Sequence, residues 1–185
     1  RYLQSNYFKV DLNKIRFAFK KLPWVRDVSL RRKWPDKIVV SIKEHQVIAR
    51  WNRVGLVNKE GEIFHAASED NLPLFIGSES HVKEITLKYK EIKKILEKEM
   101  MYVSIISLSE RLSWEITTTD RLKINLGKDD ILQKLIQFTD NFKYVISELK
   151  STIEYVDLRY RDGFSVRKTN SKSNKKIDKQ LDKTL

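Results

Sequence analysis

The chain has 185 residues, enough for one medium-sized domain or two small ones. Lysine and arginine number 37 against 25 aspartate and glutamate residues, and the net charge of +12 points to nucleic acid, an anionic membrane surface or an acidic protein as partner. The chain has no cysteine, which excludes disulfide bonds, thiol catalysis and cysteine-ligated metal sites.

The first segment is predicted to form a helix followed by a β-hairpin. Asp11 is a suitable N-cap for a helix over residues 12–22, where apolar residues recur at helical spacing. Apolar and polar residues then alternate over residues 24–33 and 38–42, and Trp34-Pro35-Asp36 between them is typical of a turn. The helix is expected to cover part of the apolar face of this hairpin.

The remaining chain alternates between short strands and two long helices. Residues 48–57 are strand-like with a break at Gly55, and Asn58-Lys59-Glu60-Gly61 is typical of a hairpin turn. The other elements follow in chain order: strands over 62–65, 72–76, 103–108, 112–118, 121–126, 153–158 and 164–166, with helices over 81–101 and 128–149. This order predicts an α+β fold with mainly antiparallel pairing, ending in a basic, disordered tail over residues 167–185.

Nothing in the sequence indicates catalysis. The closest two of the five glycines are six positions apart, which excludes a glycine-rich phosphate loop. The three histidines are scattered, no G-x-S-x-G elbow occurs, and most carboxylates lie beside lysines, as expected for solvated helix faces. We therefore expect a protein that is not an enzyme and that has no cofactor and no metal.

The sequence also bears on the relation to membranes. No stretch approaches the roughly 20 consecutive apolar residues that a membrane-spanning helix needs, and no signal peptide opens the chain. These 185 residues are therefore expected to be soluble, and a membrane anchor could precede Arg1.

Several sequence blocks, taken together, resemble one known family. The most specific block is residues 22–36, which opens with Leu-Pro-Trp-Val and closes with Trp-Pro-Asp. Further matching blocks follow in the same order at residues 49–51, 56–64, 72–74, 111–116, 123–127 and 155–160, the last reading Tyr-Val-Asp-Leu-Arg-Tyr. This pattern resembles the FtsQ/DivIB family of bacterial cell-division proteins over most of the chain.

The resemblance implies an architecture and a function. It implies a POTRA domain over residues 1–46 that lacks its first strand and helix, a β-domain over 47–166 and a tail over 167–185. It also implies the periplasmic domain of a single-pass protein of the cell inner membrane. In such proteins the β-domain binds the bitopic division proteins FtsB and FtsL and so helps to recruit and regulate septal peptidoglycan synthesis, while the POTRA domain contacts other members of the divisome.

The resemblance also implies a partner-binding site at the last strands of the β-domain. The residues carried over are Arg159, Tyr160, Gly163, Phe164, Ser165, Val166, Arg167 and Lys168. A terminal strand at a sheet edge leaves backbone groups unpaired, to which an extended partner segment can add. Tyr160 offers an apolar ring with a polar tip, although plain sheet packing is the alternative for this residue. Arginine side chains here are suited to bind carboxylates of a partner.

The sequence leaves three other interpretations open, two of which are motivated by the positive charge. A nucleic-acid-binding protein would explain it, but the sequence has no recognition-helix pattern and no RNP-like aromatic motif. A POTRA-type chaperone or transport module would use the same edge-strand mechanism with many clients. Attraction to anionic lipid headgroups would also account for the charge.

Overall fold

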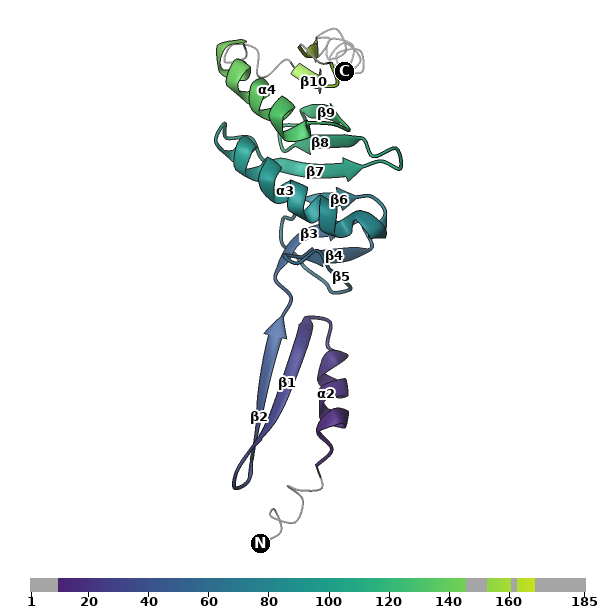
Figure 1. Ribbon diagram of the computed structural model, residues 1–185, viewed down its shortest axis with the longest axis vertical. Coiled ribbons are helices and arrows are strands. Elements are labelled where there is room, and N and C mark those ends of the chain that lie inside the picture. The colour runs from purple at the N-terminus through teal and green to yellow at the C-terminus, as the bar shows by residue number, and fades with distance from the viewer. Residues whose placement is uncertain (1–9, 146–152, 161–162, 169–185) are drawn as a thin grey trace, which may run out of the picture. The chain divides into compact units, whose positions relative to one another are not determined.

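The computed structural model describes residues 10–145, 153–160 and 163–168, and for residues 142–145 it describes the backbone alone (Figure 1). The chain forms two compact units, unit 1 over residues 1–72 and unit 2 over residues 73–185. Strands and helices are both present in the described parts of the chain, in agreement with the predicted α+β class.

Unit 1 begins with the predicted helix and hairpin. Helix α2 (Leu12–Lys20) is capped by the Asp11 carboxylate, which accepts hydrogen bonds from the backbone N–H groups of Asn13 at 2.9 Å and Lys14 at 3.2 Å. These bonds satisfy two of the N–H groups that a helix start leaves without partners, so the predicted N-cap is confirmed.

The hairpin places its apolar residues on one face. Strands β1 (Val25–Lys33) and β2 (Lys37–Glu44) pair antiparallel around the predicted turn, with Val28 opposite Ile42 and Leu30 opposite Val40. Residues directly opposite each other point to the same side of a sheet. Val28 and Leu30 are buried and β1 contacts α2, whereas Val40 and Ile42 are exposed. The helix therefore covers the β1 half of this face.

Three short strands complete the described part of unit 1. They are β3 (Val47–Trp51), β4 (Gly55–Asn58) and β5 (Ile63–Phe64), each antiparallel to the next. The predicted break at Gly55 was misplaced, since Gly55 begins β4 and the chain turns at Asn52 and Arg53, which both have positive φ. The turn at residues 58–61 is confirmed, and Gly61 has the positive φ that favours glycine.

Unit 2 contains a mixed sheet covered by two helices (Figure 1). Its strand order is β11-β10-β9-β8-β7-β6. The elements in chain order are β6 (Leu74–Ile76), the 3-10 turn η1 (Glu79–His81), α3 (Val82–Glu97), β7 (Val103–Leu108), β8 (Trp114–Thr118), β9 (Lys123–Gly127), α4 (Ile131–Val145), β10 (Ile153–Asp157) and β11 (Ser165–Lys168). Residues 146–149 of the predicted second helix lie outside the described residues.

Among the described residues of unit 2, two of the strand pairs are parallel. Strand β6 pairs with β7 and β9 pairs with β10 in parallel, while the neighbouring pairs are antiparallel, as predicted for most of the sheet. Parallel neighbours need a crossover, and the crossovers are α3 and α4. The two helices contact each other and bury apolar side chains against the strands. Leu87 of α3 is an exception and is exposed.

Candidate functional site

The predicted partner-binding strand lies at the edge of the unit 2 sheet. Strand β11 pairs with β10 along one side, with Val156 opposite Val166 and Asp157 opposite Ser165. Among the residues that the structure describes, no strand pairs with the other side of β11. All four residues of β11 are exposed. The outer side of this strand is therefore available to a further strand.

The boundaries of this edge differ slightly from those expected. Phe164 precedes β11, and its ring packs edge-on against Phe138 of α4, with ring centroids 5.5 Å apart. Arg167 and Lys168, assigned from the sequence both to the site and to the tail, form the end of β11. Residues 169–185 of the predicted tail lie outside the described residues.

Tyr160 lies beside a hollow between α4 and the chain that leads to β11. The side chain of Tyr160 is 59% exposed. The hollow has a volume of about 550 Å³ and is lined by Lys134, Gln137, Phe138, Asn141, Leu158, Tyr160, Gly163 and Phe164. Its lining combines the apolar side chains of Phe138, Leu158 and Phe164 with polar ones, so it offers contacts for both kinds of side chain of a bound segment. At Gly163 an added Cβ would meet no described atom within 4 Å, so packing in the chain itself does not require glycine there.

Arg159 is held in place by a carboxylate of its own chain. Its Nε and Nη2 donate to the Asp157 carboxylate at 2.9 and 2.6 Å, and its backbone N–H donates to the same group at 3.1 Å. The Asp157 side chain is 6% exposed and that of Arg159 is 58% exposed. The hydrogen bond from Arg159 is the main cause that lowers the pKa of Asp157, and the same bond raises the pKa of Arg159. The Asp157 carboxylate therefore fixes the position of the Arg159 guanidinium, which follows β10 at the edge of the unit 2 sheet.

Gly127 makes room for this arrangement. Its φ of +75° lies in the left-handed region, and an added Cβ would come within 3.1 Å of Cγ of Arg159. The neighbouring Tyr155 hydroxyl lies 3.4 Å from Asn125 Nδ2, and the Arg167 guanidinium carbon lies 5.3 Å from the Tyr155 ring centre. The cations of the site thus contact groups of the sheet as well as solvent.

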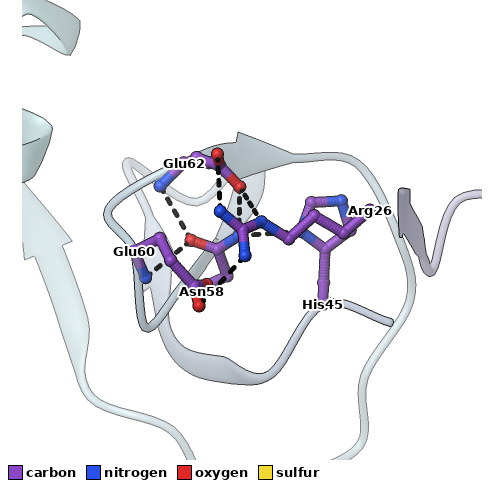
Figure 2. A network of polar contacts seen from close by, with 5 residues as sticks. All are labelled: Arg26, His45, Asn58, Glu60 and Glu62. Carbon is purple, nitrogen blue, oxygen red and sulfur yellow. Dashed lines mark hydrogen bonds and ion pairs between the residues drawn. The ribbon is translucent and has the colours of Figure 1, made fainter. Parts of the chain in front are cut away.

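A second polar cluster joins the hairpin to the β3–β5 strands within unit 1 (Figure 2). Arg26 of β1 forms a two-point contact with Glu62, with Nε to Oε2 at 2.7 Å and Nη2 to Oε1 at 3.1 Å, and its Nη1 lies 3.1 Å from Glu60. The buried Asn58 side chain donates to Glu62 at 2.7 Å and to Nδ1 of His45 at 2.8 Å. Its Oδ1 accepts the backbone N–H groups of Glu60 and Glu62.

The surroundings in this cluster lower the pKa values of two of its groups, Glu62 and His45. Hydrogen bonds from Arg26 first, and then from Asn58, lower the pKa of Glu62 to about 2. Burial lowers the pKa of His45, whose ring stacks on Phe64 with centroids 4.2 Å apart. A neutral His45 offers an acceptor to Asn58, and a protonated one offers none at that nitrogen.

Acidification is expected to weaken unit 1 in a defined range. The folded-state pKa of Glu62, about 2, lies below its ordinary value of 4.5, so the stability that the Glu62 contacts contribute is fully present above about pH 4.5 and is lost as the pH falls toward 2. The lowered pKa of His45 acts in the same direction from pH 6.5 downward. Urea unfolding of the wild type and of Glu62→Gln, measured at pH 6 and pH 3, checks this. If the free energy of unfolding decreased equally in both proteins between pH 6 and pH 3, this expectation would be contradicted.

Metal sites and membrane-spanning helices are both absent from the parts of the chain that the structure describes. In residues 10–145, 153–160 and 163–168, no group of three or more histidine, aspartate or glutamate side chains is arranged to hold a metal ion. No helix in those ranges is long and apolar enough to cross a bilayer.

Comparison with known proteins identifies the family. Residues 49–159 match the family described as "Cell division protein FtsQ/DivIB, C-terminal", and residues 1–45 match "POTRA domain, FtsQ-type". The chain belongs to the FtsQ/DivIB family of cell-division proteins. Members of the FtsQ family are non-catalytic components of the divisome, so this chain works with divisome partners.

Individual FtsQ proteins match along most of the chain. The cell division protein FtsQ of Nitrosospira multiformis is 34% identical over 169 residues, which cover 91% of this chain and 72% of that protein. FtsQ of Neisseria gonorrhoeae is 30% identical, covering 90% of this chain and 69% of its own length. FtsQ of Escherichia coli is 32% identical, covering 88% of this chain and 62% of its own length. The resemblance seen in the sequence blocks is therefore confirmed.

Sequence reasoning missed two features of these sites. It treated Arg159 as a free cation for a partner and did not foresee its pairing with Asp157, although the Asp-x-Arg spacing was visible. It also treated Asn58 as an ordinary turn residue, although its side chain contacts both His45 and Glu62. Only the fold brings Arg26 and His45 to that turn.

Proposed function

We propose that this FtsQ-family chain binds the bitopic division proteins FtsB and FtsL through the free edge of its C-terminal sheet. The observation that supports this most strongly is the position of β11, an exposed strand paired on one side. An extended partner segment that adds to β11 gains main-chain hydrogen bonds, and its alternate side chains then set the register.

The side chains around the edge fit such a partner. Tyr160 and the hollow beside α4 offer apolar surface for an anchoring side chain, and aromatic residues in such positions often dominate binding energy. Arg159, Arg167 and Lys168 favour a partner segment that carries carboxylates. The guanidinium of Arg159 has five N–H groups, so its bonds to Asp157 leave donors for a second carboxylate.

The same proposal covers the cellular setting. We place the chain in the periplasm, attached to the inner membrane by a span that precedes Arg1, and we assign it a role in recruiting and regulating septal peptidoglycan synthesis. In this arrangement residues 1–46 form the POTRA part, which contacts other divisome members. Residues 47–166 form the partner-binding β-domain, and residues 167–185 form a basic tail.

Replacing Tyr160 tests the site directly. Tyr160→Ala is expected to weaken binding of the purified periplasmic segment of an FtsB-like partner by about tenfold or more, because an interface anchor is lost. Tyr102→Ala is the matched control, since Tyr102 is 53% exposed and lies before β7, on the far side of β8 and β9 from β10. Calorimetry or fluorescence anisotropy measures both affinities. Equal affinities for the two variants would remove Tyr160 from the site.

A further inference from the structure

The tip of the β1–β2 hairpin carries an exposed indole that the sheet-edge site does not use. Trp34 stands in the turn between β1 and β2, and its side chain is 82% exposed. This is the largest exposed fraction among the large apolar side chains that the structure describes. Tryptophan with an exposed ring is favoured where apolar and polar media meet, above all at the headgroup level of a bilayer.

Positive charge surrounds this tryptophan. Residues 28–43 contain five basic side chains and one acidic side chain, Asp36. Lys33 and Lys37 lie directly opposite each other in the last pair before the turn. Side chains in directly opposed positions lie close together, so the tip carries two positive charges side by side.

The charges also share one face of the hairpin. Because neighbouring residues in a strand alternate between faces, Arg31, Lys33 and Lys37 point to the side opposite the buried Val28 and Leu30. Among the described residues, neither Arg31 nor Lys33 forms an ion pair with a carboxylate. The tip therefore presents an indole beside a positive face turned away from α2.

The tip also lies beside the start of the described chain. The Arg32 guanidinium donates to the carbonyl oxygen of Val10 at 2.6 Å. A membrane span ahead of this chain, which rests on the proposed function, would hold this end of unit 1 close to the lipid surface. The positive charge of the tip and the exposure of the Trp34 indole do not depend on the presence of such a span.

We propose that the hairpin tip, made of Arg31, Lys33, Trp34 and Lys37, docks onto an anionic lipid surface. The indole of Trp34 inserts at the headgroup level and the three cations contact lipid phosphates. Each basic residue near an anionic bilayer raises partitioning by about fivefold. The site takes acidic phospholipids, and zwitterionic lipids alone bind weakly.

Vesicle binding of the full chain tests the proposal. The probe is vesicles of equal parts phosphatidylglycerol and phosphatidylcholine, compared with phosphatidylcholine alone, in a sedimentation assay. Lys33→Gln/Lys37→Gln is expected to lower partitioning by about twenty-fivefold. The control Lys83→Gln/Lys94→Gln removes the same charge from exposed positions on α3 and should stay within about twofold of the wild type. Charges elsewhere in the chain are common to all variants.

A second readout follows the indole itself. The wild type is expected to show a blue shift of tryptophan emission on anionic vesicles, and Trp34→Phe is expected to lose it. Tip variants that bind vesicles as the α3 control does, or a blue shift that persists in Trp34→Phe, would overturn the proposal. Tip-dependent binding to an acidic peptide with no binding to vesicles would overturn it as well. None of these outcomes alters binding of the division partner to β11, so failure here is distinct from failure of the proposed function.

Discussion

A proline at an outward-facing amide of β11 is expected to abolish capture of the partner segment and to leave folding unchanged. Along an edge strand, successive N–H groups point alternately toward the neighbouring strand and outward, so Ser165→Pro and Val166→Pro remove one group of each kind. Proline lacks the N–H donor that an added strand needs, whereas edge strands tolerate it where no internal bond is lost.

The two proline variants therefore control for each other. The variant that loses a hydrogen bond to β10 should unfold at a lower temperature than the wild type. The variant whose unfolding temperature is unchanged carries the proline at the outward-facing amide. Only this outward-proline variant separates binding from folding, and it should show no measurable affinity for the FtsB-like segment. Wild-type affinity in that variant would contradict strand addition at β11. Phe164 is a poorer position for this test, because its ring also packs on Phe138.

Neutralising Asp157 is expected to weaken both the fold around β10 and the partner site. Asp157→Asn removes a buried negative charge that accepts bonds from the side chain and backbone of Arg159. Hydrogen bonds that involve charged groups contribute about 1.5–3 kcal/mol each, and because the Arg159 side chain is exposed to solvent, the expected loss of stability lies below that range. A released Arg159 also loses more conformational entropy when it contacts a partner.

A double-mutant cycle measures this contribution. Urea unfolding of Asp157→Asn, Arg159→Gln and the double variant should give a favourable coupling free energy, clearly different from zero, between the two side chains. Asp140→Asn is the matched control, because Asp140 is exposed on α4 and its neutralisation should leave stability within about 0.5 kcal/mol. A coupling free energy near zero would mean that Asp157 does not position Arg159.

Local signals in the sequence predicted most of the elements. Alternation located β1 and β2, and the Asp11 cap located the start of α2, because both depend on neighbouring residues alone. The break before β4 was misplaced because Asn52 and Arg53 adopt positive φ while the nearby glycine does not need it. The parallel pairs were not foreseen, since alternation looks the same in either direction and the pairing depends on how α3 and α4 cross over.

The candidate site was only partly visible in the sequence. The family resemblance pointed to residues 159–168, but strand order decides whether a strand lies at an edge, and no local pattern encodes that order. The same holds for the cluster around Asn58, where His45 contacts Asn58 and Arg26 contacts Glu62, because Arg26 and His45 come from other segments of the chain. Assignment to the partner site stays a prediction for Arg159, Tyr160 and Gly163 alike.

Hydrogen exchange at the amides of Ser165–Lys168 tests the central proposal most directly. It is measured on the free chain and on its complex with the periplasmic segment of the FtsB-like partner. The proposal predicts that outward-facing amides of β11, which exchange rapidly in the free chain, become protected in the complex because a partner strand accepts their hydrogen bonds. A stable complex in which these amides exchange as fast as in the free chain would show that the partner binds elsewhere.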